Sequence, residues 1–151
     1  TYYATACGRK YLTSSLKLYS KHLCGVLDSY GCVRCKSFVI KYPQFLNMNL
    51  NKHFIRGLFD GDGSLTKRKS EWKFSLVSTI ECCEEICKII KNELGIIKIP
   101  KCISKTNNNT FIIEIFGNKQ VSKVINWLYD DSIIYLDRKH EKYKELKNEL
   151  H

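Results

Sequence analysis

The chain lacks any long hydrophobic run, and no N-terminal signal segment is recognisable. A membrane-spanning helix needs about 20 consecutive apolar residues, so we expect no membrane partner. The apolar share of 44% is nonetheless that of a globular protein. At 151 residues, one ordinary domain fits, or two small repeats that share a core. Because the first residue is Thr1 rather than Met, we expect sequence upstream to be missing.

Acidic residues are scarce at the N-terminal end. Residues 1–50 hold seven basic residues and the single acid Asp28, a net charge of +6 out of +10 for the whole chain. A basic surface attracts polyanions through release of their counterions, which favours nucleic acid as a partner. Charge alone leaves open a basic protein with no such partner.

The histidines form no HxxxH or HxxH pair, and a second pair of cysteine ligands is absent. Cys32 and Cys35 form a CxxC, but a structural zinc site needs another ligand pair at similar spacing, which argues against zinc. Cys83 and Cys87 lie one helical turn apart in an apolar stretch, where a reduced cysteine behaves as a small hydrophobic residue. We therefore expect a reducing intracellular setting, with cytoplasm, nucleus and organelle not distinguished.

Two stretches of the chain resemble each other. Residues 16–31 and 113–129 each combine a short strand with a helix that has one apolar face. The apolar helix positions are Leu23, Val26, Leu27 and Tyr30 in the first stretch, and Val121, Val124, Ile125 and Leu128 in the second. This repeat predicts three parts: residues 1–42 as the C-terminal portion of a first repeat, 43–52 as a linker, and 53–151 as a second, complete repeat.

The second repeat has the periodicities of an α+β domain. We expect helices at 53–59, 81–94 and 118–129, a last helix at 138–150, and strands at 64–69, 72–77, 96–105 and 110–116. Trp72, Phe74 and Leu76 alternate with polar neighbours, so one sheet face should lie under the helices. The other face should be open, polar and basic, and a strand face can read the major groove of DNA.

Most of the first helix of this repeat and the start of its first strand make up the segment FIRGLFDGDGSL, residues 54–65. Gly57 and Gly61 lie on one helical stripe, where another backbone can approach closely. Asp60 and Asp62 fall at the negative end of the helix dipole. Two carboxylates are unfavourable there unless a cation such as Mg²⁺ binds and neutralises them. A plain helix-ending turn is the alternative.

Residues 55–63, IRGLFDGDG, resemble the LAGLIDADG nonapeptide position by position, and the flanking residues 20–37 and 135–143 resemble the same family. The chain is thus similar to the C-terminal part of a two-repeat LAGLIDADG (DOD-type) homing endonuclease. The resemblance implies the αββαββα fold and divalent-metal-dependent hydrolysis of double-stranded DNA. Only one nonapeptide is present, so the second motif helix would come from upstream sequence or from a second copy.

The resemblance also implies roles for particular residues. Asp62 would bind the metal together with the backbone carbonyl of Gly61, while Asp60 would be structural. Lys139 would be the basic catalytic residue of the second repeat, and Lys36 that of the first. The residues expected to contact DNA are Ser64, Thr66, Arg68, Lys73, Ser75 and Lys101.

Two other functions are also compatible with the sequence. One is a nucleic-acid-binding protein without cleavage activity, either a maturase or a regulator. The other is a folded remnant of a mobile element. An intron, an intein or a free-standing gene could each encode the chain, although the residues of intein splicing are not evident at its C-terminus.

Overall fold

The computed structural model describes residues 2–6, 9–13, 17, 19–33, 39–96, 102–104 and 110–150. The chain divides into two compact units, residues 1–30 and 31–151. No helix in the described ranges is long and apolar enough to cross a membrane. The predicted boundaries at residues 42 and 52 stay a prediction.

The first unit holds a hairpin and a helix. β1 (Tyr2–Ala6) and β2 (Arg9–Thr13) pair antiparallel, and α1 spans Lys21–Ser29. The side chain of Ser20 caps α1 by accepting a hydrogen bond from the Leu23 amide at 3.2 Å. The prediction of a strand just before this helix is wrong at Lys17 and Tyr19, the described positions there, because neither lies in a strand. The hairpin lies further upstream.

The apolar side of α1 is exposed rather than packed on a sheet. Val26 is 36% exposed, Leu27 42% and Tyr30 57%, and none of the α1 residues is buried. A two-stranded hairpin has too little apolar surface to cover such a helix. The matching positions of α4 in the second unit are fully buried, so the two helices share a sequence pattern but not an environment.

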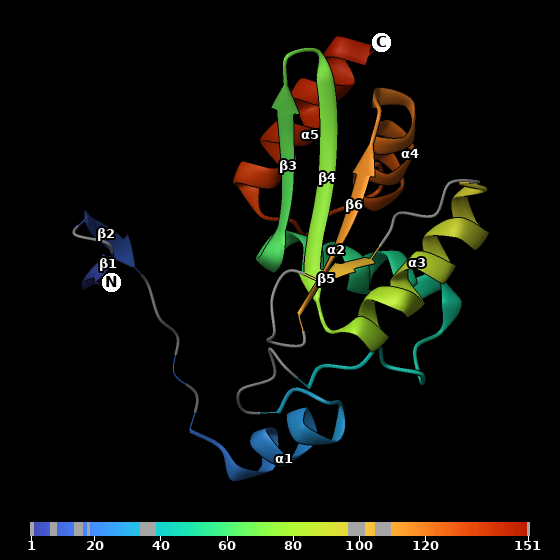
Figure 1. Ribbon diagram of the computed structural model, residues 1–151. Helices are drawn as coiled ribbons and strands as arrows, with labels where there is room; N and C mark the ends of the chain where they lie inside the picture. Colours follow the sequence, from blue (N-terminus) through green and yellow to red (C-terminus); the bar gives the residue numbers. More distant parts are fainter. Residues whose placement is uncertain are drawn as a thin grey trace. The chain divides into compact units, whose positions relative to one another are not determined.

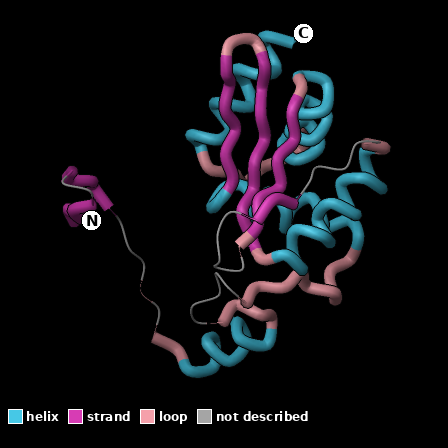
Figure 2. Tube along the Cα trace, in the orientation of Figure 1, coloured by secondary structure: helices cyan, strands magenta, loops and turns pink. Residues whose placement is uncertain are grey.

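The second unit has the predicted αββαββα order followed by a last helix. Its elements are η2 (Met48–Leu50), α2 (Asn51–Asp62), β3 (Gly63–Arg68), β4 (Glu71–Ser78), α3 (Ile80–Leu94), β5 (Cys102–Ser104), β6 (Phe111–Phe116), α4 (Asn118–Tyr129) and α5 (Asp137–Leu150). The described strands pair antiparallel in the order β3-β4-β6-β5. Figure 1 shows α4 and α5 behind these strands, and Figure 2 gives the same view by element type.

The core lies between the sheet and the helices, as the alternation in β4 predicts. Trp72, Phe74 and Leu76 are buried, while Lys73, Ser75 and Val77 on the other face are half-buried. Helix α3 contributes buried Ile86 and Ile90, and α4 contributes Val121, Val124, Ile125 and Leu128. The prediction of one helix-covered face is therefore confirmed.

Several element ends differ from the expected ones by a few residues. Helix α2 starts at Asn51 and continues to Asp62, beyond the expected end at residue 59. The hydroxyl of buried Tyr42 donates to Oδ1 of Asn51 at 2.7 Å, which anchors the earlier start. Gly95 ends α3 in the left-handed conformation, as expected of a glycine C-cap. The residues between the expected strands 96–105 and 110–116 lie outside the described residues.

The junction between α2 and β3 depends on Gly63. A Cβ atom there would lie 2.2 Å from Cδ2 of Phe59 and 2.6 Å from its carbonyl oxygen. At Gly57 and Gly61 a Cβ atom would meet nothing within 4 Å. The sequence pattern singled out Gly57 and Gly61, yet of the three glycines at residues 57, 61 and 63 only Gly63 is one where an added Cβ would clash.

Replacing Gly63 by alanine should therefore destabilise the fold. Phe59 is fully buried and cannot yield space easily, so we expect Gly63→Ala to lower the free energy of unfolding by about 1–3 kcal/mol. Gly57→Ala is the matched control and should raise it by about 0.5–1 kcal/mol, because alanine is the better helix former. Urea denaturation of both variants measures this, and equal effects of the same sign would contradict the steric argument.

Candidate functional site

The two carboxylates at the end of α2 have different surroundings. Asp60 is held on both oxygens: Oδ1 accepts a hydrogen bond from the Tyr129 hydroxyl, and Oδ2 accepts one from the Leu136 amide at 3.2 Å. Burial and the neighbouring Asp60 raise the pKa of Tyr129 well above its usual range, so this phenol stays a donor. Asp60 thus ties α2 to α4 and to the loop before α5.

Asp62 is the exposed carboxylate of the pair. It is the last residue of α2 and makes no hydrogen bond or ion pair with any residue in the described ranges. Gly61 beside it is also exposed, and its carbonyl belongs to the last helical turn, where carbonyls have no partner within the helix. Asp62 and Gly61 together present carboxylate and carbonyl oxygens to solvent.

Lys139 of α5 reaches the same helix end from inside the protein. Only 4% of it is exposed, its Nζ donates to the Gly63 carbonyl, and Nζ lies 4.6 Å from the centre of the Phe59 ring. Burial and the nearby Arg138 lower the pKa of Lys139, while the carboxylates of α2 act in the opposite direction. The structure therefore brings Lys139 and Asp62 to one place, although Lys139 lies below the surface.

Arg56 is a buried residue of the nonapeptide that the sequence analysis did not single out. Its guanidinium donates from Nη1 to the Leu128 carbonyl at 3.0 Å, and only 7% of the residue is exposed. A cation at the C-terminal carbonyls of α4 offsets the negative end of that helix. The sequence signal that could have found it is that Arg56 is the one basic residue of the nonapeptide.

The residues expected to contact DNA on β3 and β4 share the open sheet face. The cross-strand pairs Ser64–Ser75 and Thr66–Lys73 place four of them side by side, and Arg68 stands opposite Glu71 at the end of the strands. Thr66 and Arg68 are exposed, and the other three are half-buried. Lys36 and Lys101 lie outside the described residues.

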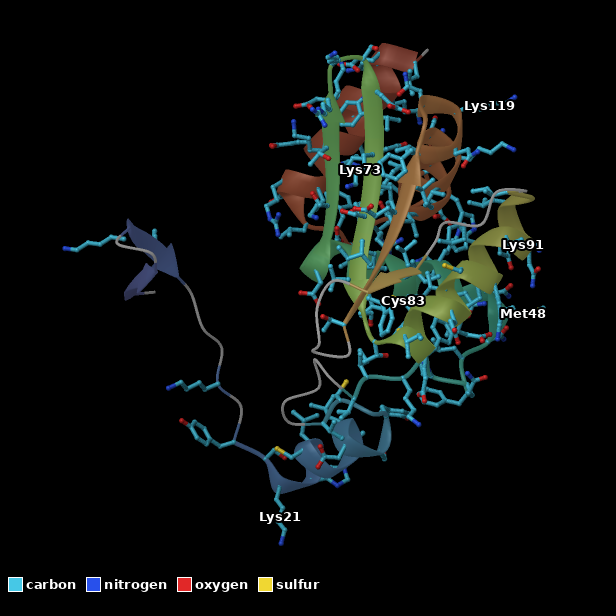
Figure 3. All side chains as sticks on the ribbon, viewed as in Figure 1. Lys21, Met48, Lys73, Cys83, Lys91 and Lys119 are labelled. Carbon is cyan, nitrogen blue, oxygen red and sulfur yellow. The ribbon has the colours of Figure 1, made fainter. Side chains whose placement is uncertain are left out.

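This face is polar, but its described strand rows are not basic. Lys73 forms an ion pair with Glu114 of β6 at 2.5 Å and lies 5.2 Å from the centre of the Phe116 ring. Arg68 stands opposite Glu71 in the strand register, so an acid and a base also share the end of these rows. Figure 3 shows where Lys73 lies on β4. The expected basic face is therefore wrong for these rows, because alternate residues of β4 and β6 supply acids as well as bases.

The described residues contain no group of three or more His, Cys, Asp and Glu side chains placed to hold a metal ion. Cys82, Cys83 and Cys87 are buried on α3, where they pack as small hydrophobic residues, as expected for the last two. A metal ion held by Asp62 and Gly61 would therefore need further ligands from outside the described residues.

Several solved structures resemble this chain. The group I intron-encoded homing endonuclease I-CeuI complexed with DNA matches with a TM-score of 0.50 and 16% identity, over 85% of this chain and 62% of that one. The archaeal intron-encoded homing endonuclease I-Vdi141I complexed with DNA gives 0.48 and 23%, over 69% and 70%. The I-SmaMI LAGLIDADG homing endonuclease bound to cleaved DNA gives 0.48 and 16%, over 89% and 45%.

The likeness to I-CeuI supports the fold, and the chain spans less than two thirds of that protein. The comparison with curated protein sequences found no match. The family model of the LAGLIDADG-like domain matches residues 49–126, just over half of the chain and including the whole of α2, β3, β4 and α3. This chain belongs to the LAGLIDADG family.

Proposed function

We propose that the chain is part of a site-specific endonuclease that hydrolyses phosphodiester bonds in double-stranded DNA. The observation that carries the proposal is the exposed Asp62 at the end of the nonapeptide helix, directly before the strand that opens the polar sheet face. The solved relative I-CeuI is a homing endonuclease complexed with DNA. Both the family and the geometry therefore favour the same chemistry.

The donor set at the end of α2 fits a hard divalent cation such as Mg²⁺. Asp62 offers a carboxylate without a protein partner in the described ranges, and Gly61 offers a carbonyl one residue away. When bound, Mg²⁺ supplies a water of lowered pKa and a positive charge beside the attacked phosphate. Asp62 would hold that ion at the helix end, and Asp60 is already engaged by Tyr129.

The remaining ligands would come from a second LAGLIDADG motif, in upstream sequence or in a second copy of the chain. Gly57 and Gly61 are exposed on one side of α2, with nothing within 4 Å of an added Cβ at either position. Leu50 is 48% exposed, and Phe54 and Leu58 beside the glycines are only partly buried. These residues form an apolar stripe whose two glycines carry no side chain, so the backbone of another helix can pack closely against it.

In this proposal DNA lies against the open face of the sheet. Ser64, Thr66 and Ser75 would meet base edges, Arg68 and Lys73 would meet bases or phosphates, and Lys101 would extend this set. Lys139 would act from below by holding the Gly63 carbonyl, and Lys36 would serve the first repeat. The buried thiols on α3 suit a reducing intracellular compartment.

The metal role of Asp62 can be tested by removing one charge. With a library of supercoiled plasmids carrying randomised inserts and Mg²⁺, we expect Asp62→Asn to lower the cutting rate about 100- to 1,000-fold. Asp28→Asn is the matched control, because Asp28 is also an exposed carboxylate in the last turn of a helix. Equal cutting by wild type and Asp62→Asn would refute the mechanism. Binding without cutting by wild type would favour the maturase or regulator function.

The second-motif contact can be tested through Gly57. Gly57→Ala should weaken self-association, or association with a partner repeat, by about tenfold or more, since a methyl group would obstruct a close helix contact. The isolated chain should become slightly more stable, so loss of association would not reflect unfolding. Sedimentation equilibrium measures the association, and an unchanged dissociation constant would exclude this stripe as the contact.

The buried position of Lys139 predicts a pH dependence of stability. Because its pKa is lowered in the folded state, the unfolded chain keeps this proton up to pH 10.5 while the folded chain loses it earlier. Between those two pKa values the wild type should gain stability with rising pH relative to Lys139→Met. Urea denaturation of both proteins across that range measures the difference, and a constant difference would contradict the lowered pKa.

A further inference from the structure

The tip of the β3–β4 hairpin has a shape that its own sequence does not favour. Arg68 and Glu71 are the last cross-strand pair, so Lys69 and Ser70 form a two-residue turn. Lys69 has a φ of 56°, a left-handed conformation that carries a steric cost for any residue with a Cβ atom. The pairing of β3 with β4 and contacts from other elements together must offset this cost.

Asn118, the first residue of α4, supplies one such contact. Pairing between β4 and β6 ends at Lys73 and Phe116. Beyond that point the Asn118 side chain continues the ladder: its Oδ1 accepts from the Trp72 amide at 2.9 Å, and its Nδ2 donates to the Ser70 carbonyl at 2.9 Å. A single amide group thus takes the place of a strand neighbour for the second turn residue, Ser70, and for the start of β4.

Glu149, near the end of α5, holds the hairpin from its helix-covered side. Its two carboxylate oxygens accept from Nε1 of Trp72 at 2.9 Å and from Nζ of Lys67 at 2.7 Å. The same Lys67 ammonium lies 5.9 Å from the centre of the Trp72 ring, and Trp72 is 1% exposed. In Figure 1 the C-terminal end of α5 lies beside the β3–β4 turn.

We propose that Asn118 and Glu149 are positioning residues that fix the hairpin tip in the shape in which it reads DNA. This inference rests on the proposed function. The exposed Arg68 and Lys69 lie at the tip, at the opposite end of β3 from Asp62. A tip that is held in place before binding loses less conformational entropy when it binds a duplex. The gain in affinity is largest for the DNA sequence whose groove fits the tip in that shape.

The sharpest variant is Asn118→Asp, which keeps the acceptor for the Trp72 amide and removes the donor to the Ser70 carbonyl. The second carboxylate oxygen would repel the Ser70 carbonyl, while an acid in the first turn of α4 favours the helix dipole and limits the loss of stability. Gln120→Glu is the matched control: it makes the same isosteric change in the same helical turn, and Gln120 makes no contact with the hairpin among the described hydrogen bonds and ion pairs. Glu149→Ala tests the other side of the tip.

The probe is a pool of duplexes of randomised sequence, from which the wild-type chain selects its preferred duplex. For each protein we compare the dissociation constants of that duplex and of the unselected pool, and the amide hydrogen exchange of residues 69–72 without DNA. For Asn118→Asp and Glu149→Ala we expect faster amide exchange at the tip. We also expect the ratio of the dissociation constants of the pool and of the selected duplex to fall about tenfold. Gln120→Glu should weaken binding to the selected duplex and to the pool by the same factor.

Two results would overturn the inference, and they are distinguishable. If exchange at the tip accelerates in Asn118→Asp while discrimination matches that of Gln120→Glu, the tip is held but its position does not serve recognition. If the wild-type chain binds no duplex above the salt-sensitive background, the proposed function fails together with this inference.

Discussion

The packing of the Phe59 ring is the interaction on which the rest of the second unit, residues 31–151, depends. It is fully buried, stacked on Phe74 of β4 with centroids 4.7 Å apart, and edge-on to Tyr129 of α4 at 6.3 Å. Gly63 passes over it without a side chain, and the ammonium of Lys139 lies above its face. The nonapeptide helix, the first strand and the last two helices are therefore fixed relative to one aromatic ring.

That arrangement explains why two carboxylates so close in sequence differ in what they can do. Asp60 follows Phe59 directly and is turned toward Tyr129 and the Leu136 amide, which satisfy both of its oxygens. Asp62 lies two residues on, past the last buried residue of α2, and faces solvent. Local packing thus separates a structural acid from one that is available to a cation, without any difference in residue type.

The sequence predicted most of the elements and the covered face of the sheet, because periodicities of 2 and 3.6 residues are local properties. It could not predict the contacts of Asp60, Arg56, Asn118 or Gly63, which join residues far apart in the chain or depend on where one ring packs. The nonapeptide pointed to Asp62 through family resemblance. The exposed apolar side of α1 shows the limit of pattern alone, since the same spacing is buried in α4.

The distribution of charge bears on how such a surface would discriminate among DNA sequences. Of the net charge of +10, residues 1–50 carry +6, whereas on the described sheet rows Arg68 stands opposite Glu71 and Lys73 forms an ion pair with Glu114. A balanced face gains little from phosphates at large, because counterion release scales with uncompensated basic residues. To bind DNA, Lys73 would have to give up its ion pair with Glu114. Only a DNA acceptor at the right position would offset the free energy of that lost ion pair. The acids on this face would therefore weaken indiscriminate binding and leave affinity to depend on the fit of individual base pairs.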